Sequence, residues 1–368
     1  MSSAVLDREC VVEAIEQDAW REAALAFADH NYRHVWEYGE IVAARNGARC
    51  EHVAIRRGDE VIALADVRIR SLPIVGGGIA YIGGGPLTRR TDSDDVETLR
   101  DAVNALRTAY VDERGLTLRI MCPLGSASWN EHAAAVIEDC GFEPAKWPKP
   151  YRTIAVRTDR PLEDVRGDFS KNWRKNLRRG EQRGVTLRVS QDPVSFDHVR
   201  TLYDGLLDRK GFDVELDANF YAAANEKMNP QERFTVILGE LDGDVCGMNV
   251  VSALGDTLVG IIGATTYEGA KRYAAYLLEW AAIELAHERG MVRYDMGGID
   301  PDDNPGGYDF KRGTRGDDLT GAGPFERKPS GLRAAFTDSA ERAYRALRRV
   351  SKGHNDGADA VNGKGEGA

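Results

Sequence analysis

The pattern of apolar and polar positions divides the chain into helical and extended segments, which follow one another in a similar order in each half. In the first half, two segments with helical spacing of apolar residues precede runs with strand periodicity. This pattern predicts helices at residues 10–30, 34–47, 92–113 and 128–140, and strands at 52–56, 61–72, 79–82, 116–121 and 152–156. The strand at 152–156 is expected to close the first half.

The arrangement begins again after Pro161. The pattern there predicts helices that contain residues 171–184, 195–207, 220–227 and 271–288, and strands at 185–189, 235–240, 245–252, 258–264 and 292–296. The sequences also correspond, because ERGLTLRI at Glu113–Ile120 matches ERGMVRYD at Glu288–Asp295. Internal similarity on this scale predicts a duplicated α/β unit.

The composition is that of a globular protein with about two domains. A chain of 368 residues with 42% hydrophobic content can bury a sizeable core. The net charge of −10 argues against a general nucleic-acid-coating surface, so we expect no DNA partner and only local contact with RNA. The N-terminus, MSSAVLDRECVVEAIEQ, has acids where a signal peptide needs an apolar run. We expect a cytoplasmic protein without a transmembrane segment, which could meet a lipid-linked substrate only peripherally.

Patterns for metals and disulfides are weak. The five cysteines are odd in number and widely scattered, with no CxxC pair, which favours reduced thiols. His30 and His34 are four residues apart, but no third ligand at a supporting spacing accompanies them, so partly buried histidines are the simpler interpretation. We therefore expect no metal site.

The stretch Tyr294–Gly313, YDMGGIDPDDNPGGYDFKRG, joins a strand end to an acidic loop and then to aromatic and cationic residues. Gly and Pro fix the path of such a loop and rigid flanks position its side chains, which is typical of functional loops. A surface turn followed by a helix is the alternative interpretation.

The segment Lys171–Arg183 can form a strongly basic helix face within this acidic protein. Its cationic residues at helical spacing are Lys171, Arg174, Lys175 and Arg178. Such a face favours binding of phosphates from RNA or a nucleotide, and a solvated helix surface is the alternative. Trp173 in the same run suits a core position better than a base-stacking one.

Five segments together resemble the Fem family of tRNA-dependent aminoacyltransferases. They are HVWEYGE (His34–Glu40), PYRTIAV (Pro150–Val156), KNWRKNLRRGEQRGV (Lys171–Val185), LLDRKGF (Leu206–Phe212) and the Tyr294–Gly313 stretch, which is the most specific. Members are cytoplasmic enzymes that use charged tRNA; they include enzymes that build peptidoglycan cross-bridges, and relatives serve antibiotic pathways. The resemblance, over roughly residues 30–330, implies an α/β fold of two tandem acetyltransferase-like (GNAT) domains, with mixed sheets flanked by helices.

The resemblance also sets the expected domain limits. We expect a first GNAT-like domain on the acceptor side at residues 1–160 and a second, catalytic domain at 161–318. Residues 319–350 are expected to supply a segment and a helix that pack back on the first domain. Residues 351–368 lack large apolar side chains and are expected to form a disordered tail.

The implied reaction is attack by an acceptor amine or hydroxyl on the ester that joins an amino acid to tRNA. Aminoacyl-tRNA is the co-substrate, and no cofactor is expected. Because the ester is already activated, the enzyme must mainly juxtapose the reactants and stabilise an oxyanion. The expected acceptor is a peptidoglycan precursor or a small intermediate of an antibiotic pathway.

Candidate catalytic residues come from the family's (Y)xFK motif and its surroundings. Lys311, which follows Phe310, matches the lysine of that motif, where a cation would stabilise the tetrahedral oxygen or the leaving ribose oxygen. Asp295 or Asp300 is the candidate general base, although an aspartate at a strand end is also a common cap or turn former.

Candidate substrate contacts are Trp36, Tyr38, Arg209 and Tyr308. Arg209 matches the region where family members hold an acceptor phosphate, and Tyr308 is expected to line the acceptor channel. A helix-terminal arginine and a core tyrosine are the respective alternatives. The basic face of Lys171–Arg183 is the candidate contact for tRNA phosphates.

Two departures from the family pattern bear on the acceptor. The run Tyr38–Val42 has no lysine where the family's WGxxK motif has one, and the second half lacks the coiled-coil arm that some members insert. Both leave room for a small amine, a hydroxylamine or a peptide as acceptor.

Two other functions stay open on the same fold. An acyl-CoA-dependent N-acyltransferase would need an R/QxxGxG/A loop before a helix, and TTYEGAKRY at Thr265–Tyr273 is a degenerate version. A non-catalytic binding protein that retains the duplicated fold is the second alternative.

Overall fold

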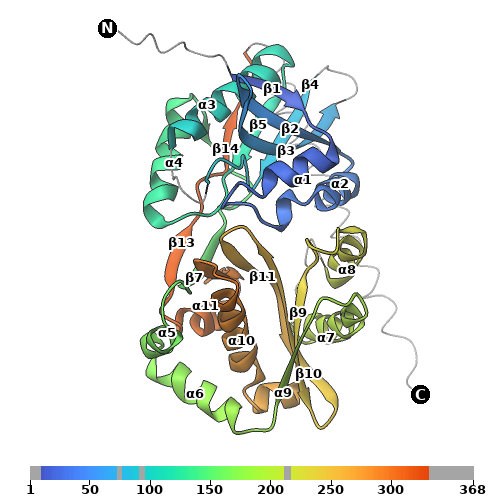
Figure 1. The fold of residues 1–368 in the computed structure, drawn as a ribbon, viewed down its shortest axis with the longest axis vertical. Helices are drawn as coiled ribbons and strands as arrows, with labels where there is room; N and C mark the ends of the chain where they lie inside the picture. The colour runs from blue at the N-terminus through green and yellow to red at the C-terminus, as the bar shows by residue number, and fades with distance from the viewer. Residues whose placement is uncertain (1–9, 73–76, 91–95, 211–216, 331–368) are drawn as a thin grey trace, which may run out of the picture.

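A computed structural model gives the fold of residues 10–72, 77–90, 96–210 and 217–330. Two seven-stranded sheets, each flanked by helices, lie end to end along the long axis of the molecule (Figure 1). None of the helices in these ranges is both long and apolar enough to cross a membrane. The helix expected within 319–350 falls mostly at 331–350, which lies outside these residues, as does the tail 351–368.

The first sheet has the strand order β1-β2-β3-β4-β5-β14-β6. Its strands are β1 (Cys10–Ala14), β2 (Arg49–Arg57), β3 (Glu60–Leu72), β4 (Gly77–Gly83), β5 (Thr117–Met121), β6 (Glu143–Pro144) and β14 (Phe325–Arg327). The helices of this half are α1 (Gln17–Ala24), η1 (Tyr32–His34), α2 (Trp36–Arg45), α3 (Val96–Arg107), the π-helical turn η2 (Thr108–Glu113) and α4 (Ala127–Asp139). Apolar side chains of α3 and α4 pack on β2–β5 and form the largest core cluster.

The second sheet has the order β13-β7-β12-β11-β10-β9-β8. Its strands are β7 (Arg152–Arg157), β8 (Thr186–Ser190), β9 (Thr235–Leu241), β10 (Asp244–Leu254), β11 (Thr257–Thr265), β12 (Arg293–Gly298) and β13 (Asp317–Thr320). The helices are α5 (Leu162–Asp168), α6 (Lys171–Glu181), α7 (Ser195–Lys210), α8 (Ala218–Lys227), α9 (Tyr267–Lys271), α10 (Ala274–Glu288) and α11 (Pro305–Arg312). The apolar face of α10 packs against β9–β12.

The two sheets confirm the duplication that the sequence indicates, with one exchange of strands. In each sheet four successive strands are antiparallel and a fifth joins in parallel, β5 beside β4 and β12 beside β11. The sixth position is taken by a strand from the other part of the chain, because β7 pairs with β12 and β14 pairs with β5. The strand at 152–156 therefore belongs to the second sheet and does not close the first half.

One predicted element is wrong. Residues 10–14 lie within the predicted helix 10–30 but form β1, which pairs antiparallel with β2 from Cys10 opposite Arg57 to Ala14 opposite Val53. The β-branched residues Val11 and Val12 suit an extended edge strand, and pairing with β2 satisfies their backbone groups. The helix begins only at Gln17.

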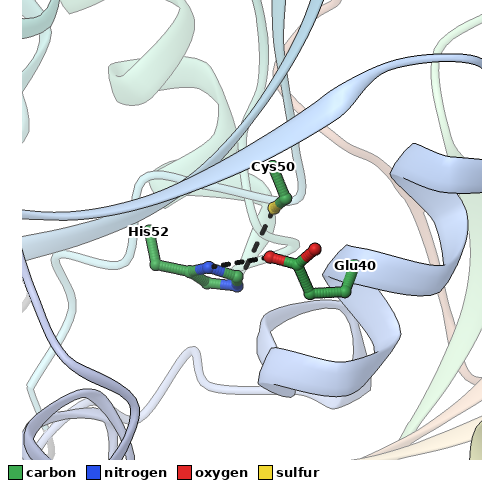
Figure 2. Close-up of side chains that lie close together, drawn as sticks. All are labelled: Glu40, Cys50 and His52. Atoms are coloured by element: carbon green, nitrogen blue, oxygen red, sulfur yellow. Dashed lines mark hydrogen bonds and ion pairs between the residues drawn. The ribbon is translucent and has the colours of Figure 1, made fainter.

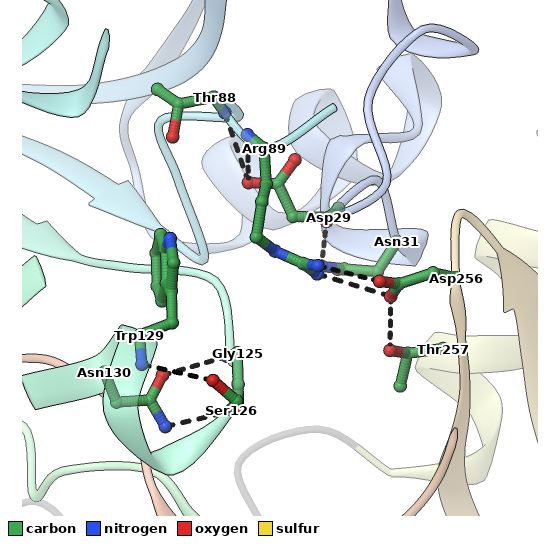
Figure 3. A network of polar contacts seen from close by, with 10 residues as sticks. All are labelled: Asp29, Asn31, Thr88, Arg89, Gly125, Ser126, Trp129, Asn130, Asp256 and Thr257. Atoms are coloured by element: carbon green, nitrogen blue, oxygen red, sulfur yellow. Dashed lines mark hydrogen bonds and ion pairs between the residues drawn. The ribbon is translucent and has the colours of Figure 1, made fainter. Parts of the chain in front are cut away.

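The two halves meet through an apolar cluster and a buried ion pair. Tyr32 and Tyr38 of the first half pack against Phe234 and Phe220 of the second, with ring centroids 6.0 and 5.7 Å apart, respectively. The Arg89 guanidinium forms two hydrogen bonds with the Asp256 carboxylate, at 2.8 and 3.3 Å, where the β10–β11 turn reaches the first half (Figure 3). Both partners are largely buried, so this contact fixes the halves against each other.

Removal of either partner of this ion pair should be costly. We expect Arg89→Met or Asp256→Asn to lower the free energy of unfolding by about 3 kcal/mol, because each change leaves an uncompensated buried charge or donor. Urea denaturation measures the effect, and the double variant should lose less than the sum of the single losses. Arg152→Met is the matched control, because the Arg152–Asp318 pair is also bidentate but more exposed. This change should lower the free energy of unfolding by less than about 1 kcal/mol. Additive losses would contradict a coupled pair.

Candidate active site

The sheet of the second half opens at the end of β12. In the first half the parallel pair β4–β5 is matched over five residues, from Ile79 with Thr117 to Gly83 with Met121. In the second half β11 and β12 are matched over only three, ending at Val259 with Asp295. Gly297 follows with φ +80°, and a side chain there would meet the Gly260 carbonyl oxygen at 2.8 Å. Only glycine permits this turn.

Asp295 lies at the point where the two strands part. It is 3% exposed, and its Oδ1 accepts hydrogen bonds from the Thr153 hydroxyl at 2.5 Å and the Gly297 N–H at 2.9 Å. The Tyr151 hydroxyl donates to the same carboxylate, at 2.9 Å from Oδ2. Burial raises the pKa of Asp295 above its usual value even though these bonds favour the charged form. A carboxylate with a raised pKa, held in a fixed orientation, is suited to accept a proton.

Lys311 reaches the same place from α11. Its ammonium donates hydrogen bonds to the carbonyl oxygens of Gly297 and Gly298, at 3.0 and 3.1 Å. Burial lowers the pKa of Lys311, and the nearby carboxylates of Glu279 and Asp295 oppose that shift. Because an ammonium has three donors, two bonds to backbone carbonyls leave one N–H for a reacting oxygen.

Glu279 and Tyr294 complete this cluster from α10 and β12. The buried Tyr294 hydroxyl donates to Glu279 Oε2 at 2.7 Å and accepts a hydrogen bond from the Asn249 amide at 3.0 Å. Burial raises the pKa of Glu279. The ammonium of Lys311 thus lies in the field of two acids, the buried Asp295 and the half-buried Glu279, each of which accepts a hydrogen bond from a tyrosine.

Other residues expected in the Tyr294–Gly313 stretch lie beside this cluster. Phe310 packs against Tyr276 and Trp173, with centroids 5.0 and 6.1 Å away, so its contacts anchor α11 to the core. Tyr308 is half-buried, and its hydroxyl donates to Asp318 at 3.4 Å. Lys311 and Asp295 thus lie at the same strand end, where both bind Gly297. Phe310 and Tyr308 pack against the apolar core beside them.

Asp300 has a different environment from Asp295. The Lys149 ammonium lies 2.9 Å from its carboxylate, and the backbone N–H groups of Asp302 and Asp303 also donate to it. The Lys149 hydrogen bond above all lowers the pKa of Asp300 to about 2. A carboxylate with so low a pKa is a weak base, so of the two aspartates the geometry favours Asp295.

The basic segment forms α6, which packs on α10. Trp173 is buried, as its core interpretation required. Lys171, Lys175 and Arg178 are exposed, and within the described part of the chain they have no acidic partner, whereas Arg174 donates to the Gly167 carbonyl. The helix therefore presents a cationic surface on the half that contains Lys311.

The remaining expected substrate contacts come from both halves. Trp36 stacks on His52 with centroids 3.7 Å apart, and Tyr38 is buried in the apolar cluster between the halves. Arg209 belongs to the last turn of α7, but its side chain lies outside the described residues. His34 uses both ring nitrogens, one near the Asn31 N–H and one near the Gly84 carbonyl, which agrees with an ordinary buried histidine.

A pocket between the halves has Asp295 in its lining. Its walls also include Asp29–Arg33 and Gly84 of the first half, Asp256–Thr257 and Val259 of the second, and Tyr151. Several buried polar atoms there have no hydrogen-bond partner, among them Asp29 Oδ1 and His30 Nε2. Such atoms are typical of a site that a polar ligand completes.

Arg33 is the cation of this pocket. Its guanidinium donates to the Tyr32 hydroxyl at 2.6 Å and lies 4.7 and 5.6 Å from the ring centroids of Tyr32 and Tyr151. No carboxylate forms an ion pair with it within the described residues, although the side chain is half-buried. A guanidinium enclosed by tyrosines without an acid favours an anionic ligand.

Sequence reasoning missed four of these residues: Arg33, Asn249, Tyr151 and Glu279. Tyr151 could have been found, because it lies within the PYRTIAV segment that carries part of the family resemblance. Glu279 is one of three glutamates on the helix α10, and its spacing does not distinguish it from the others. Its position becomes evident only when α10 is packed beside β12.

Comparisons with known proteins agree with the fold. The model of the acetyltransferase (GNAT) domain family matches residues 167–312. No curated protein matches the sequence. The crystal structure of FemX superposes with a TM-score of 0.73 at 15% identity and covers 86% of this chain and 97% of its own. The C-terminal domain of a putative lysylphosphatidylglycerol synthetase from Agrobacterium fabrum gives a TM-score of 0.51 at 15% identity, covering 82% of this chain and 89% of that one.

The second half of the chain is therefore a GNAT-type domain. The two halves together have the Fem-like tandem GNAT fold, as the resemblance implied. L-PGS from Bacillus licheniformis shares this arrangement, with a TM-score of 0.51 at 15% identity over 87% of this chain and 94% of its own.

Proposed function

We propose that this protein is an aminoacyltransferase that moves an amino acid from aminoacyl-tRNA to an acceptor held in the pocket between its halves. The observation that carries the proposal is that the Lys311 ammonium and the Asp295 carboxylate both form hydrogen bonds with Gly297, where β11 and β12 part. The sequence motif around Lys311 and the fold shared with FemX support it.

The chemistry needs only these two groups. The acceptor amine attacks the ester carbonyl carbon, and Asp295 takes the proton that the amine loses. The oxygen that becomes negative is stabilised by the free N–H of Lys311. The bond to the tRNA ribose oxygen then breaks, the proton passes to that oxygen, and an amide is formed. No covalent enzyme intermediate is required.

The basic face of α6 is the proposed contact for tRNA phosphates. Lys171, Lys175 and Arg178 are available because none has an acidic partner within the described ranges. The acceptor would bind in the pocket that residues of both halves line together with Asp295. This division agrees with an acceptor-side first half and a catalytic second half.

Charge reversal on α6 tests the tRNA contact. We expect Lys175→Glu with Arg178→Glu to weaken tRNA binding. The slope of the logarithm of the binding constant against the logarithm of the salt concentration should become less steep by about 1 to 2, because each lost phosphate contact removes roughly 0.7–0.9 from it. Binding is measured by filter retention across a salt series. Lys227→Glu, an exposed change at the end of α8, is the control. An unchanged slope would return α6 to the status of a solvated helix surface.

Arg33 tests the nature of the acceptor. We expect the wild-type protein to prefer amines that carry an anionic group, and Arg33→Met to raise their KM about tenfold or more with kcat little changed. The measurement compares glycine with methylamine as acceptors in aminoacyl transfer. Because Arg33 has no ion-pair partner within the described chain, its replacement leaves no unpaired buried carboxylate. Equal use of both amines by the wild-type protein would refute this role.

The reaction itself is tested with the purified protein and a mixed pool of charged tRNA. Release of amino acid from tRNA should depend on the protein and should be matched by amide formation on an added amine. If tRNA stays charged while acetyl-CoA is consumed, the chain is an acyl-CoA-dependent transferase. If neither donor is consumed, it is a binding protein.

A further inference from the structure

A second group of reactive side chains lies in the first half, away from Lys311. Cys50 and His52 are two apart on β2 and so project from the same face of the sheet, and Asp66 on β3 is paired directly opposite His52. Glu40 of α2, which covers this face, points at the His52 ring (Figure 2). One thiol, one imidazole and two carboxylates thus converge on one point.

The distances between these groups are close to those of a metal site. Cys50 Sγ and Asp66 Oδ2 each lie 3.8 Å from His52 Nε2. A tetrahedral Zn²⁺ ion with bonds of about 2.0–2.3 Å would place neighbouring donors about 3.3–3.6 Å apart. A shift of a few tenths of an ångström would therefore bring Cys50 Sγ and Asp66 Oδ2 each to the separation from His52 Nε2 that two zinc ligands have.

The Asp66 carboxylate is incompletely satisfied in a way that fits this geometry. Arg68 donates to Oδ1 at 3.1 Å, while Oδ2 is buried and has no hydrogen-bond partner. The side chain is only 3% exposed, so the free oxygen cannot be hydrated from bulk solvent. Asp66 Oδ2 would be 1.9 Å from a Cβ at position 39, so the glycine there makes room for the group.

The surroundings hold the imidazole in place. The Trp36 ring stacks on the His52 ring, with centroids 3.7 Å apart and an angle of 11° between the ring planes. Trp20 contacts His52 edge to face, with centroids 5.0 Å apart. Glu40 Oε1 lies 3.8 Å from Nδ1, the nitrogen left over for a carboxylate when Nε2 binds an ion.

We propose that Cys50 Sγ, His52 Nε2 and Asp66 Oδ2 bind a single divalent cation of the Zn²⁺ class, with Glu40 orienting the imidazole through Nδ1–H. On binding, the S–H bond of Cys50 breaks, a sulfur–metal bond forms and the proton leaves to solvent. Three protein ligands leave a fourth position for water or a ligand group. Nothing in the sequence marks this site, because its ligands come from two strands, β2 and β3, and not from a spaced metal-binding motif.

The test uses the full-length protein, freed of any affinity tag, stripped with a chelator and then titrated with Zn²⁺ or Co²⁺ alone. We expect one equivalent of Zn²⁺ to be retained through gel filtration and to raise Tm by several degrees. Co²⁺ should give a thiolate-to-metal charge-transfer band in the near ultraviolet. Neither readout depends on catalysis.

Variants assign the ligands. We expect Cys50→Ser to abolish the Co²⁺ band and to weaken Zn²⁺ binding 100-fold or more, while Glu40→Gln weakens it about 10–100-fold and keeps the band. Cys246→Ser, a change at another buried free cysteine, is the matched control and should behave as wild type. Circular dichroism confirms that each variant is folded. Binding of less than a tenth of an equivalent by the wild-type protein, or a band that survives Cys50→Ser, would overturn the proposal.

Discussion

Replacement of Lys311 by alanine is expected to lower kcat about 10²-fold or more, with little change in affinity for aminoacyl-tRNA. The reason is that its ammonium is fixed by the Gly297 and Gly298 carbonyls, so that its remaining N–H meets the charge on the ester oxygen only as that charge develops. An interaction made only in the transition state lowers kcat and kcat/KM together when it is lost. Single-turnover transfer and an equilibrium tRNA-binding assay give the two quantities.

Lys271→Ala is the matched control for this experiment. Lys271 belongs to the same half, but it is exposed and forms an ordinary surface ion pair with Glu268. Its loss should change kcat less than twofold. Weakened tRNA binding with normal turnover in Lys311→Ala would move Lys311 from the reacting centre to the tRNA surface.

Much of the fold could be predicted because it depends on periodicity that repeats. The hairpin strands of both halves and the helix that precedes β12 follow from local alternation, and the match of Glu113–Ile120 with Glu288–Asp295 predicted the duplication. The exchange of β7 and β14 could not be predicted in this way, since a strand's pattern of buried residues does not say which of two similar sheets it joins. The short strand β1 was missed because five residues of amphipathic sequence fit either period.

The candidate site could be predicted only for residues that lie close to one another in the sequence. Lys311 and Asp295 are 16 positions apart on consecutive elements, and one motif contains both. Arg33 and Glu279 come from distant segments, and each is an ordinary charged residue until the halves and helices are packed. Likewise, Asp300 and Asp295 look alike in sequence, and only the ion pair with Lys149 and the burial of Asp295 give them opposite pKa shifts.

The two copies of the unit show how one site arises from a duplicated fold. In the first copy β4 and β5 stay paired to the strand ends, so backbone groups satisfy one another and no opening forms. In the second copy pairing ends at Asp295, and the freed Gly297 carbonyl accepts a hydrogen bond from Lys311. Loss of two backbone pairs is therefore what lets a side-chain cation reach the strand end.

Asp295→Asn is the second change with a large expected effect, a fall in kcat of about 10²–10⁴-fold. The fold should tolerate it, because an amide oxygen can accept the bonds from Thr153 and Gly297 while its NH₂ donates to the Tyr151 oxygen. Removal of a buried carboxylate with a raised pKa should leave stability at neutral pH unchanged or higher. Asp300→Asn, at the exposed pair with Lys149, should retain activity within about twofold.

The pH profile separates a base from a merely structural carboxylate. A base must be deprotonated, so kcat should fall as the pH decreases through the pKa of Asp295, which lies above the ordinary aspartate value of about 3.9. Tyr151→Phe removes a donor that favours the charged carboxylate, which raises this pKa further. The acid limb of the profile should then move to higher pH in Tyr151→Phe and keep its position in Asp300→Asn. If the limb stays in place without the Tyr151 hydroxyl, the proton is accepted by a group other than Asp295.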